Sequence, residues 1–233
     1  MRALVIIPAY NEAESILKVV QGVSELGYDY VVVNDGSRDA TLEICRANNL
    51  NVLDLPQNLG IGGAVQAGHK YAQRYGYDVD IQFDGDGQHD AAYLGALISE
   101  IERGKDLVVG SRYLVPSVGF QSTAMRRFGK SLLSNVIRFV SGVNVTDPTS
   151  GFRACGRRAI DLFCDDYPTD YPEPESIVRA LKSGLIVDEV PVLMHERQGG
   201  ISSIGVVSSA YYMIKVTLSI LIVALAHCFE RGE

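Results

Sequence analysis

The chain has 233 residues, 47% of them hydrophobic and 21% charged, which is enough for one well-buried domain with a short appendage. Its 21 basic and 28 acidic residues give a net charge of −7, which argues against general nucleic-acid binding. The cysteines form no CxxC pair, which argues against a structural zinc site and fits a reducing cytosol.

Apolar strand-like runs alternate with helical patterns through the first half of the chain. This alternation predicts an α/β fold with a mostly parallel central sheet and helices on both faces. Ligands of such sheets bind at the carboxyl ends of the strands, where "PAYNE", "NDGS" and "DGDGQH" fall. The expected strands cover 3–8, 28–37, 51–55, 79–83 and 106–113, and the expected helices cover 12–26, 39–49, 60–76 and 91–104.

The second half is less regular. A helix over 122–142 carries a run of basic residues, which by itself usually marks a solvated helix face. The segment 145–163 is expected to be a loop that leads into a helix. A further helix is expected over 172–184, with proline near its start, and a strand followed by a glycine-serine loop over 185–203.

The stretch "IQFDGDGQHD" places three acidic residues and a histidine directly after an apolar run. Counting from Asp84, an EF-hand would need glycine at His89 and glutamate at Gly95, so that calcium loop is excluded. Two interpretations remain, a solvated acidic turn and a D-x-D metal site. In the second, Asp84, Asp86 and Gln88 would offer oxygen ligands suited to Mg²⁺ or Mn²⁺.

The glycine-rich stretch "NLGIGGAVQAG" invites a dinucleotide-binding interpretation. That fingerprint would need glycine where Val65 stands, and the motif follows the third expected strand rather than the first. The favoured interpretation is a helix that packs closely on the sheet through its small residues, which are Gly62, Gly63, Ala64 and Gly68.

Seven motifs together resemble family 2 glycosyltransferases, most closely the branch of dolichyl-phosphate mannose synthases and polyprenyl-phosphate glycosyltransferases. They are "IPAYNE", "VVVNDGS", "NLGIGGAVQAG", "FDGDGQH", "VVGSRY", "DPTSGFRA" and "EVPVLMHERQGG". They occur in the family's order, and the resemblance runs from about Ala3 to Ser203. It implies the GT-A fold, a nucleotide-sugar-binding α/β fold of the kind expected above.

The resemblance also implies roles for individual residues. A nucleotide pocket is expected from Pro8, Tyr10, Glu12, Asp35 and Asp84, and a site for Mg²⁺ or Mn²⁺ from Asp84, Asp86 and Gln88. A carboxylate at Asp35 would accept a hydrogen bond from the ring N–H of uracil or guanine. Phosphate or acceptor binding is expected from Arg112, Arg127, Ser131, Arg153 and Arg197, and catalytic roles from Asp86, Asp147 and Glu175.

Two of these expectations have alternatives, and a further segment departs from the family's pattern. Asp147 acts either as a base or as a positioning group, because a phosphate acceptor is already an anion near neutral pH. Glu175 fits equally an ordinary first-turn glutamate of a helix. The segment 200–203 reads Gly-Ile-Ser-Ser and lacks the lysine that related enzymes often carry there, which puts one phosphate contact in doubt.

The implied activity is inverting, metal-dependent transfer of a sugar from a UDP- or GDP-linked donor to polyprenyl phosphate at the cytosolic membrane face. Two alternatives stay open, a non-lipid glycan acceptor and a catalytically silent nucleotide-sugar-binding subunit of a membrane complex. The sequence decides neither the sugar nor the oligomeric state.

The chain divides into an expected catalytic domain over 1–203 and an apolar tail over 204–233. The N-terminus lacks a signal-peptide pattern, which favours a cytosolic location. As a helix, the apolar run 216–229 would span ~21 Å, short of a ~30 Å bilayer core. A helix that lies on the membrane surface or docks on a membrane partner is therefore expected, with a terminal helix buried against the domain or in a dimer as the alternative.

Overall fold

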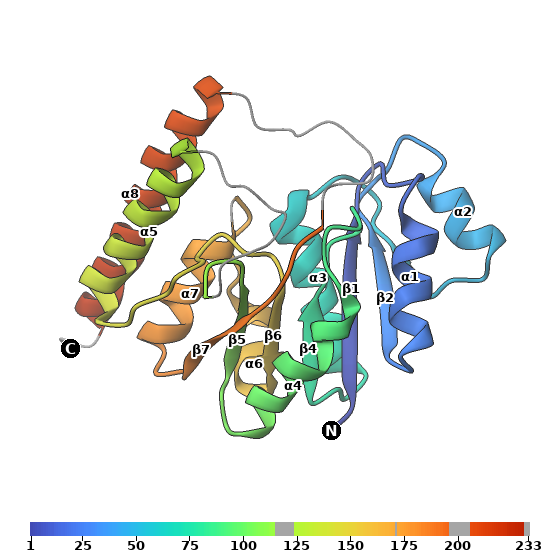
Figure 1. Cartoon of the computed structure of the whole chain (residues 1–233), viewed down its shortest axis with the longest axis horizontal. Helices are drawn as coiled ribbons and strands as arrows, with labels where there is room; N and C mark the ends of the chain where they lie inside the picture. Colours follow the sequence, from blue (N-terminus) through green and yellow to red (C-terminus); the bar gives the residue numbers. More distant parts are fainter. Residues whose placement is uncertain (115–123, 171, 196–205, 231–233) are drawn as a thin grey trace.

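The computed structural model describes residues 1–114, 124–170, 172–195 and 206–230, with the backbone alone for 124–128, 206–212 and 227–230. One seven-stranded sheet forms the centre of this described part, in the order β3-β2-β1-β4-β6-β5-β7 (Figure 1). All its pairings are parallel except those of β6. The strands are β1 (Ala3–Ala9), β2 (Asp29–Asn34), β3 (Val52–Asp54), β4 (Val79–Gln82), β5 (Leu107–Ser111), β6 (Arg153–Gly156) and β7 (Val187–Pro191).

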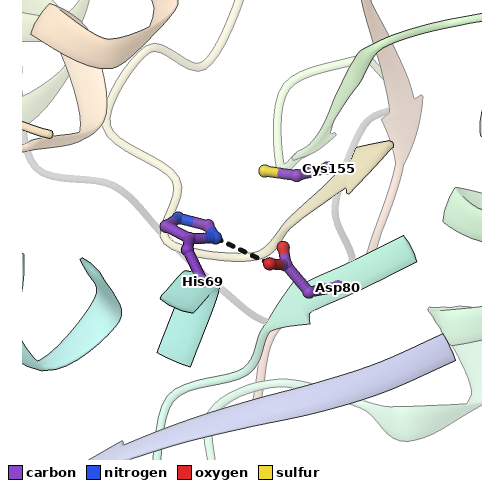
Figure 2. Close-up of side chains that lie close together, drawn as sticks. All are labelled: His69, Asp80 and Cys155. Atoms are coloured by element: carbon purple, nitrogen blue, oxygen red, sulfur yellow. Dashed lines mark hydrogen bonds and ion pairs between the residues drawn. The ribbon is translucent and has the colours of Figure 1, made fainter. Parts of the chain in front are cut away.

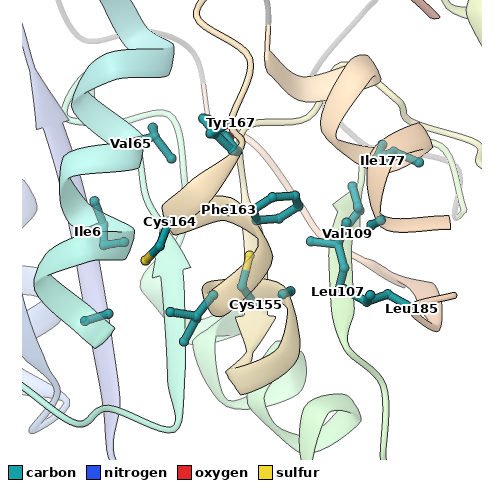
Figure 3. Packing of buried hydrophobic residues seen from close by; sticks show 14 of the residues in the cluster. Ile6, Val65, Leu107, Val109, Cys155, Phe163, Cys164, Tyr167, Ile177 and Leu185 are labelled. Atoms are coloured by element: carbon teal, nitrogen blue, oxygen red, sulfur yellow. The ribbon is translucent and has the colours of Figure 1, made fainter. Parts of the chain in front are cut away.

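Helices cover both faces of the sheet because successive strand residues point to opposite sides. In β1, Leu4 and Ile6 join a core with α3, α5, α6, α7 and α8, whereas Val5 and Ile7 join a core with α1, α2 and α4. Figure 3 shows part of the first core. The helices are α1 (Ile16–Glu25), α2 (Thr41–Ala47), α3 (Gly60–Arg74), α4 (Leu94–Glu102), α5 (Ala124–Ser141), α6 (Arg157–Asp165), α7 (Pro172–Lys182) and α8 (Val206–Glu230), with a 3₁₀ turn at Ala91–Tyr93.

The sequence predicted a loop at the start of segment 145–163, but Arg153–Gly156 within it form strand β6, so this part of the prediction was wrong. This short strand lies antiparallel between β4 and β5, with Asp80 opposite Cys155 and Gln82 opposite Arg153. The four residues Arg-Ala-Cys-Gly carry no apolar alternation, and their strand conformation depends on two neighbours that are distant in sequence.

The small residues of α3 allow close packing, as the sequence predicted, but not all against the sheet. A side chain at Gly68 would overlap Ile6 of β1, so this glycine faces the sheet. At Gly62, by contrast, a Cβ would overlap the backbone of Pro168 and Thr169, which follow α6. The glycines of α3 therefore fit the helix between the sheet and a neighbouring segment.

Replacing Gly62 with valine should lower the free energy of unfolding by about 2–3 kcal/mol, because the overlapping atoms are backbone atoms that yield little. For a chain of this size the melting temperature should fall by about 4–12 °C, measured by circular dichroism. Gly22→Ala is the matched control, since nothing lies within 4 Å of a Cβ there. It should leave stability unchanged or raise it by up to about 1 kcal/mol. Equal melting temperatures for the two variants would contradict the proposed contact.

The apolar tail forms α8, which packs against α5 and α7 and lies beside α5 at one end of the sheet (Figure 1). Val216 and Ile220 belong to the first core, whereas Ile214, Leu218 and Ile222 are exposed. None of the described helices is both long and apolar enough to cross a bilayer. One face of the helix is thus buried against the domain, and the domain boundary at 203/204 stays a prediction.

Candidate functional site

The polar clusters singled out in the sequence meet at one edge of the sheet. The carboxyl ends of β1, β2, β4 and β5 share this edge because these strands run parallel, and antiparallel β6 begins there. Strand β1 pairs with β2 on one side and with β4 on the other, so the chain reverses its direction of winding at β1. Such switch points leave a crevice at the carboxyl edge where ligands bind.

Asp84 stands at this edge directly after β4 and is held from two sides. Its Oδ2 lies 3.0 Å from His89 Nε2, and its Oδ1 accepts a hydrogen bond from Gln82 at 3.1 Å. The His89 ring is buried against Phe83 and Phe152. Burial alone would raise the pKa of Asp84, but the charge and hydrogen bond of His89 and the bond from Gln82 lower it below its ordinary value. The Asp84 carboxylate is therefore fixed and ionised.

Asp86 lies in the same turn, which rests on the end of β1. Its side chain is buried and accepts a hydrogen bond from the Gln88 N–H at 3.0 Å. A Cβ on Gly85 would stand 3.0 Å from the Pro8 carbonyl, and Ser15 donates to the Gly85 carbonyl at 2.7 Å. The D-x-D pair thus lies beside the "PAYNE" segment, as the site predicted from sequence requires.

Gln88 connects the turn to the segment after β7. The Gln88 backbone N–H donates to Asp86 within the acidic turn, and the Gln88 backbone carbonyl accepts a hydrogen bond from the His195 N–H at 2.9 Å. The side-chain nitrogen of Gln88, Nε2, lies 3.5 Å from the His195 carbonyl oxygen. With the amide nitrogen directed to that carbonyl, the amide oxygen is the atom left to act as the expected metal ligand, and that role stays a prediction.

The expected nucleotide residues lie around the ends of β1 and β2. Asp35 is buried, and its Oδ1 accepts a hydrogen bond from the Leu59 N–H at 2.6 Å. Pro8 is buried, Tyr10 is exposed, and Glu12 accepts a hydrogen bond from Ser15. The proposed bond from Asp35 to a base stays a prediction, since one of its oxygens already anchors the start of α3.

A buried ion pair joins the end of β5 to the loop before β6. Asp147 is fully buried and accepts hydrogen bonds from Arg112 Nε at 2.6 Å and Nη2 at 2.7 Å. Burial alone would lower the pKa of Arg112, but the hydrogen bonds and charge of Asp147 raise it above its ordinary value, and the charge of Asp84 adds to this. Both carboxylate oxygens of Asp147 are therefore engaged, which favours positioning over general-base work.

Glu189 of β7 fixes the backbone that carries Asp147, a role that the sequence did not reveal. It accepts hydrogen bonds from the N–H groups of Thr146 and Asp147 at 2.6 and 2.9 Å. Burial raises the pKa of Glu189 in spite of these bonds. The "EVP" motif that carries Glu189 was noticed only as part of the resemblance, and its spacing gives no sign of a contact with residues 146 and 147.

Lys130 is a second residue that the sequence placed on a helix but not in the site. Its Nζ lies 4.3 Å from the centre of the Tyr113 ring, and the Arg112 guanidinium lies 5.7 Å from the same ring. Ser131, which was expected to bind phosphate, is exposed on α5. The side chain of Arg127 and the whole of Arg197 lie outside the described residues. Two cationic groups, one of them already paired with Asp147, therefore lie close to the Tyr113 ring.

Arg153, which was expected to bind phosphate or acceptor, is buried inside the molecule, and that role stays a prediction. Its side chain is 1% exposed and donates to the carbonyls of Ser150 and Glu173 and to the Ser176 hydroxyl. These bonds tie β6 to the start of α7 inside the molecule. The expected role came from the resemblance of the "DPTSGFRA" motif, which does not indicate that β6 is buried.

Glu175 lies on α7, where its carboxylate is occupied by helix contacts. One oxygen accepts hydrogen bonds from Arg179 at 2.7 and 3.0 Å, and the other accepts one from Ser219 of α8. This arrangement supports the alternative of a structural glutamate, and the catalytic role stays a prediction.

Gly151 sets the space available to Asp84. A Cβ at this position would stand 2.8 Å from Asp84 Oδ2 and 3.0 Å from Gln82 Nε2. Gly151→Ala should therefore displace the carboxylate and lower kcat/KM by about 10–10²-fold, because small misplacements of catalytic groups cost this much. Gly95→Ala is the control, since only the Tyr28 hydroxyl lies near its Cβ, at 3.7 Å. Unchanged donor turnover in Gly151→Ala would contradict this account.

The sheet and the groups on its carboxyl edge place the protein among glycosyltransferases of the GT-A fold. The model of the family described as Glycosyl transferase family 2 matches residues 4–163, so the chain belongs to this family. The family resemblance, the fold class and the enzyme class expected from the sequence are confirmed.

Two curated relatives and one solved structure illustrate the similarity. A polyprenol monophosphomannose synthase of Mycolicibacterium smegmatis is 34% identical over 92% of this chain and 85% of its own. A UDP-N-acetylglucosamine–dolichyl-phosphate N-acetylglucosaminyltransferase of Methanococcus voltae is 32% identical over 80% of this chain and 83% of its own. Glucosyl-3-phosphoglycerate synthase of Mycobacterium tuberculosis, solved with Mn²⁺, UDP-glucose and phosphoglyceric acid, has a TM-score of 0.71 at 18% identity over 97% of this chain and 79% of its own. The last similarity supports the fold alone.

Proposed function

We propose that this glycosyltransferase moves a sugar from a nucleoside-diphosphate sugar to a polyprenyl phosphate, with inversion at the anomeric carbon. The observation that carries the proposal is that Arg112 and Lys130 both lie close to the Tyr113 ring, at the same edge as the D-x-D turn. Two cations suit an anionic acceptor better than a neutral sugar hydroxyl. The names of the two curated relatives support a polyprenyl or dolichyl phosphate as that acceptor.

The donor side of the site fits a hard divalent cation. Asp84 and Asp86 offer carboxylates from one turn and Gln88 an amide oxygen, the ligand types that Mg²⁺ and Mn²⁺ prefer. When bound there, such an ion would neutralise charge on the nucleoside diphosphate as it departs. UDP- and GDP-linked donors remain equally compatible with Asp35.

The acceptor side needs orientation more than proton removal. A phosphate monoester is an anion near neutral pH, so its oxygen attacks the anomeric carbon while the bond to the diphosphate breaks on the opposite face. Arg112 would orient this phosphate, and Asp147 fixes the guanidinium through two hydrogen bonds. Glu189 in turn fixes Asp147 through its backbone N–H. Each contact holds one group in position for an in-line attack.

A turnover screen tests the proposal. The full chain is incubated with UDP- and GDP-sugars and Mg²⁺ or Mn²⁺, with and without polyprenyl phosphate, and release of the nucleoside diphosphate is measured. Release that depends on the lipid and disappears on chelation is expected. Metal-dependent donor binding without turnover on any lipid phosphate would overturn the proposal in favour of a glycan acceptor or a silent subunit.

Lys130→Gln should raise the KM for polyprenyl phosphate about 10-fold, because it removes one charge-assisted contact to the acceptor. The KM for the donor should change little. Arg138→Gln is the matched control, since Arg138 is an exposed basic residue two turns further along the same helix. Equal effects of the two variants would indicate that the basic helix acts only through its overall charge.

We also propose that the enzyme works at the cytosolic membrane surface, where its lipid acceptor must be met. Helices α5 and α8 expose a set of apolar side chains, termed the α5–α8 face, which comprises Leu132, Phe139, Ile214, Leu218, Ile222 and Leu225. Side chains of this kind favour the interface of a bilayer over water.

Sedimentation with phospholipid vesicles tests this surface. The double variant Phe139→Ser and Ile222→Ser should lose most vesicle binding, because these side chains are 86% and 64% exposed and should not affect folding. Leu26→Ser, at a 52% exposed position after α1, should bind like the wild type. Equal binding of all three proteins would contradict membrane contact through the α5–α8 face.

A further inference from the structure

Three ionisable side chains meet inside the first core, outside the site described above. His69 comes from α3, Asp80 from β4 and Cys155 from β6, and each is at most 1% exposed (Figure 2). Asp80 and Cys155 are directly opposite each other in the antiparallel β4–β6 pair, which puts both side chains on one face of the sheet. One potential ligand atom from each of the three residues lies within 4.8 Å of the others.

This cluster is unusual because its hydrogen-bonding capacity is only partly used. His69 Nδ1 lies 2.7 Å from Asp80 Oδ2. Asp80 Oδ1 has no N–H or O–H partner among the described residues, and neither has His69 Nε2 or the Tyr167 hydroxyl. Figure 2 shows Asp80 Oδ1 turned to the side on which the Cys155 sulfur lies. Buried polar atoms without partners are costly, so Asp80 Oδ1, on the side of Cys155, favours a further ligand between these two residues, whereas His69 Nε2 lies on the far side of the ring.

We propose that His69, Asp80 and Cys155 form a binding site for Zn²⁺ or a similar borderline-soft divalent cation. Imidazole nitrogen, carboxylate oxygen and thiolate sulfur are the donors that Zn²⁺ takes in proteins, and a water molecule would supply the fourth ligand. The two negative charges of Asp80 and the Cys155 thiolate balance the charge of the ion, which suits a buried site.

Cys155 must lose its proton for this binding. Burial raises the pKa of the Cys155 thiol well above its ordinary value, the charge of Asp80 and a hydrogen bond to it raise the pKa further, and the charge of Arg153 opposes this rise. Without a cation the thiol therefore keeps its proton. Binding forms the metal–sulfur bond and releases that proton to solvent, which makes the affinity increase with pH.

The spacing of the cysteines gave no sign of this site, because the three residues are far apart in the sequence and assemble only through the fold. It is also chemically distinct from the D-x-D turn. The ligands expected at that turn, Asp84, Asp86 and Gln88, offer oxygen atoms, which suit hard cations, whereas a thiolate selects softer ones. A bound ion would join α3, β4 and β6 below the reaction site and so stabilise the sheet rather than take part in the reaction.

Cobalt substitution provides the test. The full chain is produced in medium with Co²⁺, so that the ion enters during folding, and is purified without chelator. A near-ultraviolet thiolate-to-Co²⁺ absorption band and about one tightly held ion per chain are expected. Protein produced with Zn²⁺ should melt several degrees higher than protein refolded in the presence of a chelator.

Matched variants distinguish an ion at this cluster from one bound at another thiol or at the D-x-D turn. Cys155→Ala and Asp80→Asn should lose the cobalt band, whereas Cys164→Ala, a buried thiol outside the cluster, should keep it. Asp86→Asn, which alters only the D-x-D turn, should also keep it. No band in the wild type, or a band that persists in Cys155→Ala, would overturn the proposal. The wild-type result decides even if a variant does not fold.

Discussion

Asp86→Asn should lower kcat/KM about 10²–10³-fold, the loss typical when one electrostatic stabiliser is removed from a reaction site. Asparagine keeps the size of the side chain and an oxygen that accepts the Gln88 N–H, which lies 3.0 Å from Asp86 Oδ1. The melting temperature should therefore change by no more than about 2 °C. The measurement is donor turnover at saturating Mg²⁺ or Mn²⁺, with melting followed by circular dichroism.

Asp90→Asn is the matched control for this prediction. Asp90 belongs to the same acidic stretch, but its carboxylate caps the turn at Ala91–Tyr93 by accepting the Ala92 N–H at 2.9 Å. Asparagine is an equally good cap, so activity should stay close to that of the wild type. Similar losses in both variants would show that the stretch acts through its net charge rather than through Asp86.

Asp147→Ala should lower the free energy of unfolding by about 3 kcal/mol, because it leaves the Arg112 guanidinium without its counter-charge. The melting temperature should fall by about 6–12 °C. Arg112 Nε and Nη2 lie 2.6 and 2.7 Å from the two Asp147 oxygens, so the pair is lost by either single substitution.

A double-mutant cycle checks this coupling. Arg112→Leu alone leaves a fully buried carboxylate unpaired and should be similarly unstable. The double variant Asp147→Ala and Arg112→Leu should lose less stability than the sum of the two single losses, because neither charge is then left alone. Additive losses would mean that the pair contributes little beyond its separate contacts.

The apolar pattern predicted the sheet well but could not foresee β6. Strands such as β1 and β5 are buried on both faces, so a continuous apolar run marks them directly. Strand β6 begins with Arg153 and ends in glycine, and its position depends on β4 and β5. The burial of Arg153 could not be foreseen for the same reason, because the resemblance that suggested its role carries no information on the pairing of β6.

The residues of the candidate site also fall into two groups, those whose position follows from the local sequence and those that only the fold brings together. The position of Asp84 and Asp86 at the carboxyl edge was predictable because both follow one strand, where local order in the sequence also determines position in space, and their role in the site stays a prediction. The pairing of Arg112 with Asp147 joins residues 35 positions apart, and either charge alone looks like a free functional group. Lys130 was named only as one member of a basic helix, because nothing local shows that it reaches Tyr113.

Helix α5 carries both Lys130, beside Tyr113, and Phe139, which is 86% exposed. These residues are nine positions apart, a rise of about 13 Å along a helix at ~1.5 Å per residue. If the α5–α8 face rests on a bilayer as proposed, the axis of α5 lies along the lipid surface and this rise is a lateral distance. The rigid helix would then keep Lys130 close to the surface, so the acceptor phosphate would be bound while its hydrocarbon chain stays in the membrane, whatever the length of that chain.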